Sequence, residues 1–165
     1  MPLCNPTDLT GLLKPGERLL GLDVGTKTIG MALSDTTRMV ATPFDTIRRG
    51  RFRDDVQRLL TEVDRHGVGG VVVGLPISLD GREGSRAQGV RQFAKNLLAQ
   101  RDLPLAFWDE RLSTAAVERE MIAADLTRKR RAEIIDKVAA AYILQGLLDR
   151  LRQRIAPIGE HYSGS

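Results

Sequence analysis

The chain has 165 residues, and its 25 lysines and arginines exceed its 21 aspartates and glutamates by four, a net charge of +4. This length suits one domain, which can bury a core without disulfide crosslinks, so a disulfide miniprotein is excluded. With 42% hydrophobic and 28% charged residues, the composition is typical of a globular domain, and neither of a disordered chain nor of a membrane bundle.

The cysteine and histidine content and the lack of targeting or membrane-spanning segments narrow the class of protein further. The single cysteine, Cys4, excludes an internal disulfide, and the histidines His66 and His161 lack the spacing of zinc ligands. A bound metal would therefore be held mainly by oxygen. The first 17 residues do not resemble a signal peptide, and no apolar stretch reaches the length of a membrane span. We expect a cytoplasmic protein without a membrane partner.

The hydrophobic pattern predicts an α/β domain. In chain order it indicates five strands, at residues 18–24, 28–34, 39–47, 71–77 and 104–108. It indicates four helices, at residues 51–66, 85–98, 113–126 and 132–154. The first three strands form a meander and the later two need helical crossovers, which predicts a five-stranded mixed sheet flanked by helices.

Local signals support these elements. Gly67 occupies a C-cap position after the first helix, and Ser85 with Gln88 forms a capping-box signature for the second. Pro43 indicates an edge strand or a bulge. We divide the chain into an N-terminal extension at residues 1–17, one domain at 18–156 and a flexible tail at 157–165.

Acidic residues stand at the ends of two predicted strands. Asp23 ends the first strand although aspartate is a poor strand former, and it shares a face with Gly21, which leaves room beside it. A turn-initiating aspartate is the ordinary alternative. Asp109 and Glu110 follow the fifth strand, at the edge where ligands gather in open α/β sheets. The alternative there is a solvated acid favoured by the dipole of the next helix.

A third acid, Asp136, lies at the top of the apolar stripe of the last predicted helix. The stripe consists of Ala139, Ala140, Ile143 and Leu147. A carboxylate beside a buried face needs a partner, because its unpaired burial is costly. Lys137, Arg131 or the N-terminus of the helix would serve, and so would a shared metal. Separated acids without thiols or paired histidines suit Mg²⁺ or Mn²⁺, which activate water in phosphodiester hydrolysis.

Four segments, in the same order, resemble the motifs of the YqgF (RuvX) family. They are Leu-Gly-Leu-Asp-Val-Gly-Thr-Lys-Thr-Ile-Gly-Met-Ala-Leu-Ser-Asp at 20–35, Val-Gly-Leu-Pro at 73–76 with Asp-Gly at 80–81, Asp-Glu-Arg-Leu-Ser-Thr at 109–114, and Ile-Asp-Lys-Val-Ala-Ala at 135–140. The resemblance runs from about residue 18 to 151. It implies a ribonuclease H-like fold related to the Holliday-junction resolvase RuvC, and a proposed role in maturation of the 5′ end of 16S ribosomal RNA.

The resemblance also implies the site residues. It makes Asp23, Asp136 and either Asp109 or Glu110 the metal-binding and catalytic acids, with the other member of that pair as a supporting catalytic acid. Wider ribonuclease H relatives usually place an acid on the fourth strand, but residues 71–77 contain none, so the pair at 109–110 must substitute. Consecutive Phe107 and Trp108 break the alternation, which leaves open which acid of the pair points inward. We favour Glu110 for its longer reach.

Basic residues near the acids are candidate contacts to nucleic acid. One basic block is expected to link the last two helices, where it would contact phosphates or, as the alternative, be only a solvated linker. It consists of Arg128, Lys129, Arg130 and Arg131. Near the other predicted turns and helix starts the candidates are Lys27, Arg82, Arg86, Arg111 and Ser113. We interpret a further cluster as solubilising, namely Arg48, Arg49, Arg51 and Arg53.

These observations predict a metal-dependent nuclease on structured RNA, with Mg²⁺ or Mn²⁺ as cofactor, acting as a monomer or homodimer. The resemblance specifies processing of the 5′ end of pre-16S rRNA. One alternative is a Holliday-junction or branched-DNA resolvase, which needs two active sites related by a two-fold axis. Another is a non-catalytic RNA-binding assembly factor. The glycine turn after Asp23 also resembles the phosphate loop of actin-like ATPases, but these use two such domains.

Overall fold

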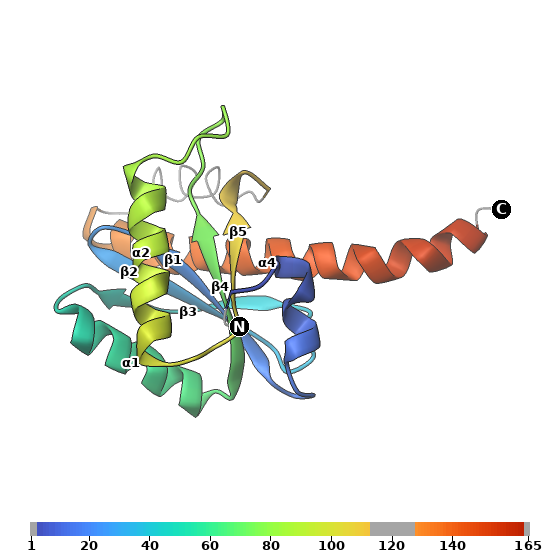
Figure 1. Cartoon of the computed structure of the whole chain (residues 1–165), viewed down its shortest axis with the longest axis horizontal. Helices are drawn as coiled ribbons and strands as arrows, with labels where there is room; N and C mark the ends of the chain where they lie inside the picture. The colour runs from blue at the N-terminus through green and yellow to red at the C-terminus, as the bar shows by residue number, and fades with distance from the viewer. Residues whose placement is uncertain (1–2, 113–127, 164–165) are drawn as a thin grey trace.

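A computed structural model describes the backbone of residues 3–112 and 128–163, and the side chains of residues 3–112 and 134–152. Five strands form one sheet (Figure 1), at β1 (Arg18–Val24), β2 (Thr28–Ser34), β3 (Ala41–Arg48), β4 (Val68–Leu75) and β5 (Leu105–Asp109). Their order in the sheet is β3-β2-β1-β4-β5. β1 pairs antiparallel with β2 and parallel with β4, which pairs parallel with β5. The predicted five-stranded mixed sheet is confirmed.

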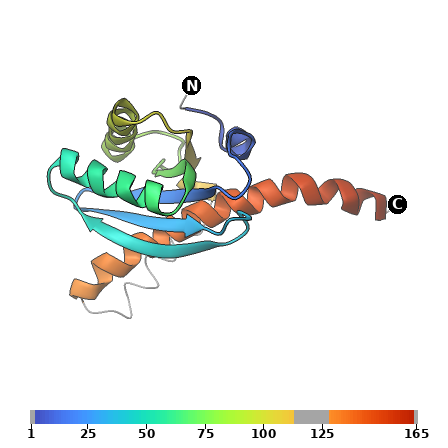
Figure 2. The same ribbon diagram turned by 90° about the horizontal axis from the view of Figure 1, so that it is seen from below.

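Helices cover both faces of this sheet. They are the 3₁₀ helices η1 (Pro6–Leu12) and η2 (Glu110–Leu112) and the α-helices α1 (Phe52–Arg65), α2 (Ser85–Gln100) and α4 (Arg128–Ser163). Figure 2 shows α1 and α2 on one face and α4 on the other. Although α4 has 36 residues, no described helix is long and apolar enough to cross a membrane.

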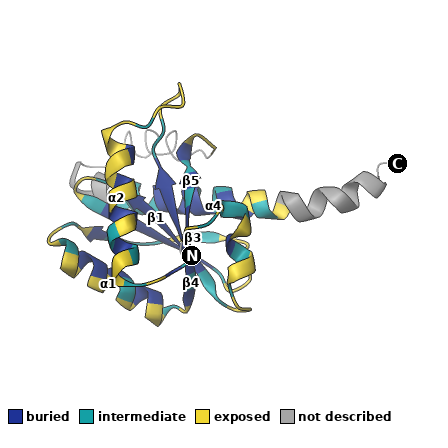
Figure 3. Ribbon diagram, viewed as in Figure 1, coloured by how far each residue is buried: buried dark blue, intermediate teal, exposed yellow. Residues whose placement is uncertain are grey.

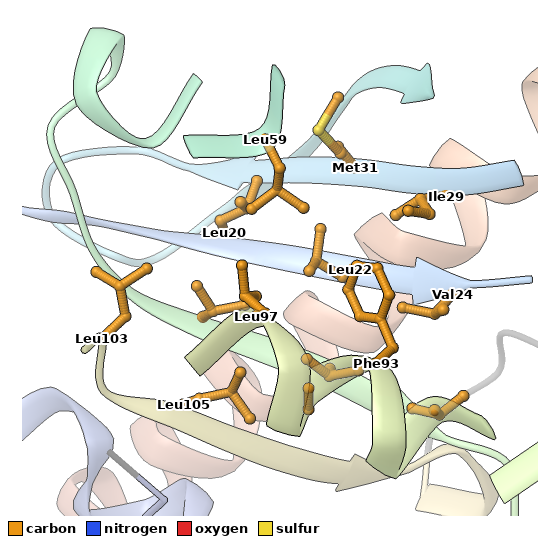
Figure 4. Packing of buried hydrophobic residues seen from close by; sticks show 14 of the residues in the cluster. Leu20, Leu22, Val24, Ile29, Met31, Leu59, Phe93, Leu97, Leu103 and Leu105 are labelled. Atoms are coloured by element: carbon orange, nitrogen blue, oxygen red, sulfur yellow. The ribbon is translucent and has the colours of Figure 1, made fainter. Parts of the chain in front are cut away.

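Strict alternation along the strands gives each face its own core. Leu20, Leu22 and Val24 of β1 belong to the cluster under α1 and α2, together with Phe93 of α2 (Figure 4). Leu19 belongs to the second cluster, under α4. Because both faces are covered, β1, β2 and β4 are buried almost throughout, whereas the edge strand β3 is mostly not (Figure 3).

Small residues on the α4 face bring this helix close to the sheet. A Cβ atom on Gly21 would lie 2.8 Å from the Cβ atom of Leu144 and 2.9 Å from the carbonyl oxygen of Ala140. The room that Gly21 leaves beside Asp23 is therefore filled by α4. The predicted stripe of the last helix is confirmed as its buried face, consisting of Ala139, Ala140, Ile143 and Leu147.

Several local predictions differ from the structure. α2 begins at Ser85 itself, with Gly84 as N-cap and no side-chain capping hydrogen bond, so the capping-box prediction is wrong. α4 begins at residue 128 and continues to 163, through residues that we expected to form a linker at one end and a tail at the other. The predicted helix at 113–126 lies outside the described residues. Gly67 has a positive φ of 63° directly after the C-cap of α1, as expected.

The edge position of β3 agrees with Pro43. This residue pairs with Ala32 beside a register shift in β2, which is where a residue without an amide proton is tolerated. β3 is the first strand in the sheet order and pairs only with β2.

The β2–β3 turn is held by Asp35, which gives a pH-dependent prediction. Its carboxylate accepts hydrogen bonds from the Thr37 hydroxyl and from the amides of Met39 (2.8 Å) and Val40 (3.0 Å). The Thr37 bond and the two amide bonds hold the pKa of Asp35 well below its ordinary value of 3.8. Asp35→Ala should lower the free energy of unfolding by about 1 kcal/mol at neutral pH.

The depressed pKa fixes the sign of the pH effect. The contribution of Asp35 is fully present above about pH 4 and declines as acid protonates the folded carboxylate. Urea unfolding at pH 7 and at progressively lower pH should therefore show the difference between the wild type and Asp35→Ala shrinking. Asp102→Ala, which removes an exposed acid in the loop before β5, is the control. A difference that stays constant down to the lowest pH would contradict this role.

Candidate active site at the carboxyl edge of the sheet

Asp23 lies on β1, one residue from its end, with 3% of its surface exposed. Gly21 faces α4, and alternation places Asp23 on the same face. Its neighbours across both strand pairs are glycines. Asp23 pairs with Gly30 of β2, and since Leu22 pairs with Val73 of β4, the next residue of β4, Gly74, lies beside it. The carboxylate of Asp23 is thus flanked by two positions without side chains.

Gly30 allows α4 to contact the sheet at Asp136. A Cβ atom on Gly30 would overlap the carbonyl group of Asp136 and lie 2.7 Å from the amide nitrogen of Lys137. The side chain of Asp136 accepts a hydrogen bond from the hydroxyl of Thr28, two residues before Gly30 on β2. α4 therefore places the Asp136 carboxylate over β2, next to the strand pair that contains Asp23.

Gly74 of β4 likewise allows Glu110 to approach the sheet, on the side of Asp23 opposite Gly30. A Cβ atom on Gly74 would lie 2.9 Å from Oε1 of Glu110 and would overlap Cδ1 of Ile143, a residue of α4. Glu110 begins η2, directly after β5, and only 9% of its surface is exposed. Its carboxylate is therefore buried over β4, on the same face as Asp23.

The alternation of β5 separates the two acids that the sequence left open. Leu105 and Phe107 pack in the cluster under α1 and α2, whereas Ala106 and Trp108 pack under α4. Asp109 follows Phe107 by two residues, so its side chain lies on the same face as Phe107 and points away from α4. The Arg111 guanidinium binds it with Nε and Nη2 at 3.0 and 2.6 Å, and this pairing lowers the pKa of Asp109.

Asp23, Glu110 and Asp136 come from three separate elements and gather at one end of the α4 face. Their carboxylate oxygens are the donors that a hard divalent cation prefers. Each of the three has further interactions in the structure, and within the described residues no three His, Cys, Asp or Glu side chains are close enough together to hold a metal ion. Metal binding by these acids stays a prediction.

The basic residues predicted to contact nucleic acid differ in whether they are exposed or lie beside an acidic residue. Lys27 is exposed in the β1–β2 turn, at the same edge as the acids, and Arg86 is exposed in the first turn of α2. Arg82 lies in the preceding loop, 3.6 Å from Asp80, and Arg111 is engaged by Asp109. The block at 128–131 occupies the first turn of α4, and its side chains, like Ser113, lie outside the described residues.

Sequence reasoning missed three residues that build this site, namely Thr28, Gly30 and Gly74. Thr28 holds Asp136, and the glycines let Asp136 and Glu110 approach the sheet. The available signal was a glycine inside an otherwise regular strand, which often marks a close approach of another segment.

Comparison with known proteins places this arrangement in a family. The family model described as RuvX, Holliday junction resolvase, matches residues 17–150. The chain belongs to the RuvX family. Two similar relatives are named "Putative pre-16S rRNA nuclease". The one from Paramagnetospirillum magneticum is 61% identical, over 90% of this chain and 96% of its own length. The one from Rhodospirillum rubrum is 55% identical, over 93% and 97%.

Solved structures similar to this RuvX chain share its fold. RuvC from T. thermophilus, in complex with a Holliday junction substrate, aligns with a TM-score of 0.52 and 12% identity, over 82% of this chain and 96% of its own. The yeast mitochondrial Holliday junction resolvase Ydc2 aligns with a TM-score of 0.51 and 11% identity, over 88% and 83%. The predicted ribonuclease H-like fold is confirmed, as are the family resemblance and the nuclease class that it implied.

Proposed function

We propose that this RuvX protein is a divalent-metal-dependent phosphodiester hydrolase that processes the 5′ end of pre-16S rRNA in the cytoplasm. The observation that supports it best is the gathering of Asp23, Glu110 and Asp136 on the α4 face at the carboxyl edge of the sheet. The names of relatives that align over nearly the whole chain support the RNA substrate.

In this proposal the chain itself supplies placement and charge. The three carboxylates, which all belong to described residues, are not close enough together in this structure to share an ion, so they would have to approach one another to hold Mg²⁺ or Mn²⁺, which in such sites activates water and stabilises the leaving oxygen. Thr28 orients Asp136 through its hydroxyl, while Gly30 and Gly74 keep bulky side chains out of the space beside Asp23. Lys27, exposed at the same edge, would attract the phosphate backbone.

Cleavage of defined substrates tests this function. The purified protein is incubated with a pre-16S 5′ precursor RNA, a four-way DNA junction and an unstructured single strand, each with Mg²⁺ and with Mn²⁺. We expect metal-dependent cleavage of the precursor RNA that EDTA abolishes. Metal-dependent binding without cleavage of any substrate would contradict a hydrolase and favour an assembly factor.

Junction resolution is the second candidate, because the family description itself names a Holliday junction resolvase. Symmetric cleavage of a junction requires two active sites, and so a dimer on the DNA. Light scattering of the protein with and without the four-way junction separates the candidates. Paired cuts made by a junction-bound dimer would favour this candidate, whereas a junction-bound monomer would exclude it.

The different orientations of Asp109 and Glu110 predict different mutant phenotypes. Glu110→Gln should lower the cleavage rate at least about 100-fold, because a buried metal-facing carboxylate contributes a few kcal/mol to transition-state stabilisation. Asp109→Asn should retain most activity and lose only the partly exposed ion pair with Arg111, which contributes little to stability. Single-turnover cleavage and urea unfolding measure the two effects. The reverse order of activity loss would assign the site to Asp109.

A further inference from the structure

A pocket of 240 Å³ opens at the same edge of the sheet, on the face opposite the acids. It lies between the β1–β2 turn and the first turns of α2, and Val24 is one of its lining residues. Its polar lining consists of Thr26, Arg49, Ser85 and Arg86, and no acidic residue takes part. The lining therefore offers two guanidinium groups and two hydroxyls, which are donors suited to a phosphate.

Seven other arginines form ion pairs among the described side chains, unlike these two. Carboxylates pair with the guanidinium groups of Arg58, Arg65, Arg82, Arg91, Arg101, Arg111 and Arg152. Among the side chains that the structure describes, no carboxylate pairs with Arg49 or Arg86. The positive charge in this pocket is therefore not neutralised by a described acid.

Arg49 is held in place by the site rather than extended into solvent. Its Nη1 donates a 2.7 Å hydrogen bond to the carbonyl oxygen of Gly25, and its guanidinium lies 5.5 Å from the ring centroid of Phe93. Its backbone amide also donates to the carbonyl of Lys27 at 2.8 Å. The bond to Gly25 uses one of the five N–H donors of the guanidinium. This placement differs from the solubilising interpretation of the cluster at 48–53.

The pocket and the acids share the end of β1. Neighbouring residues of a strand point to opposite faces, so Asp23 faces α4 while Val24 forms part of the pocket. A polyanion that crosses the carboxyl edge of the sheet would meet the acids on one side and the arginines on the other. We propose that this pocket binds a backbone phosphate of the nucleic acid, distinct from the phosphate that is cleaved. This inference rests on the proposed nuclease function and adds a second phosphate contact to it.

Salt-dependent binding tests the pocket. The probe is a single-stranded RNA, bound by Asp23→Asn protein so that cleavage does not interfere. Each lost phosphate contact lowers the slope of log affinity against log salt by about 0.7 for a single strand. We expect this decrease for Arg86→Gln and for Arg49→Gln. Arg53→Gln removes the same charge from an exposed site on α1 and should leave the slope unchanged. Unfolding midpoints check that the variants fold.

Two further arms locate the phosphate and identify its source. In the first arm, each RNA probe carries one neutral methylphosphonate linkage, at a different position in each probe. We expect one such linkage, away from the cut, to weaken binding by the Asp23→Asn protein. The same linkage should not weaken binding by the protein that carries both Asp23→Asn and Arg86→Gln. Calorimetric titration with inorganic phosphate tests the other source. If phosphate binds but Arg86→Gln leaves the RNA salt slope unchanged, the pocket is a free-anion site and the proposal is overturned.

An equal decrease for Arg53→Gln would also overturn it, because the effect would then be diffuse charge. The test separates this inference from the nuclease proposal. Absence of cleavage by the wild-type protein would contradict the hydrolase while leaving the measured phosphate contact intact. An unchanged slope in an active enzyme would contradict the pocket alone.

Discussion

Asp23→Asn is expected to reduce cleavage at least about 1,000-fold while RNA binding persists, since loss of a metal-binding carboxylate removes several kcal/mol of transition-state stabilisation. Asp23 is 3% exposed, between Gly30 and Gly74. No neighbouring strand residue can supply a replacement carboxylate there, because both flanking positions lack side chains. Single-turnover cleavage and fluorescence anisotropy of labelled RNA measure the two quantities.

The conservative change keeps the shape of the side chain, so a loss of activity would not reflect a cavity. Asp102→Asn makes the same charge change at an exposed position in the loop before β5 and serves as the control. If the Asp23→Asn protein cleaves as fast as the wild type, Asp23 does not belong to the catalytic site. If it loses RNA binding and cleavage together, its role is in binding rather than in the chemical step.

Gly30→Ala is expected to lower the free energy of unfolding by about 3 kcal/mol, at the upper end of the usual cost of overpacking, and to lower activity with it. The added methyl group would overlap the carbonyl group of Asp136, which is helix backbone and cannot rotate away. α4 would have to move, and with it the carboxylate that Thr28 holds. Urea unfolding and cleavage assays report the two losses.

Gly50→Ala provides the matched control, because a Cβ atom at Gly50 meets nothing within 4 Å and no positive φ is found there. It should leave stability within about 0.5 kcal/mol and activity unchanged. A Gly30→Ala protein as stable and active as the wild type would mean that α4 does not contact β2 as closely as the structure indicates.

The sheet could be predicted because its strands have regular hydrophobic patterns. The ranges of β1 and β2 agree with the prediction, since alternating patterns and a short polar turn define both ends of this hairpin. The helical segments before the later strands predicted crossover connections, whereas the order of the strands in the sheet came from the structure. α4 was harder to delimit, because an amphipathic stripe indicates where a helix is buried but not how far it continues beyond the sheet.

The candidate catalytic acids show more clearly what could not be predicted from the sequence. Asp23 and Asp136 could be singled out because each is an acid beside an apolar pattern. The alternation could not decide between Asp109 and Glu110, since a strand covered on both faces has apolar residues in both phases, as Phe107 and Trp108 show. The structure separates the two orientations, because Phe107 packs under α1 and α2 while Trp108 packs under α4. The pocket at Arg49 depends on contacts between residues far apart in sequence, which no local pattern reveals.

The close contact between α4 and the small residues of the sheet has a consequence for sequence divergence among relatives. On the α1 and α2 face, a larger side chain can be offset by a smaller neighbour, and such volume-conserving exchanges are tolerated. At Gly21, Ala140 and Leu144 the contact involves backbone and Cβ atoms, and the same helix positions Asp136. Substitutions accepted by the first face should therefore accumulate faster over evolution than those along this helix. An alignment of RuvX sequences would show two rates of change within one small domain.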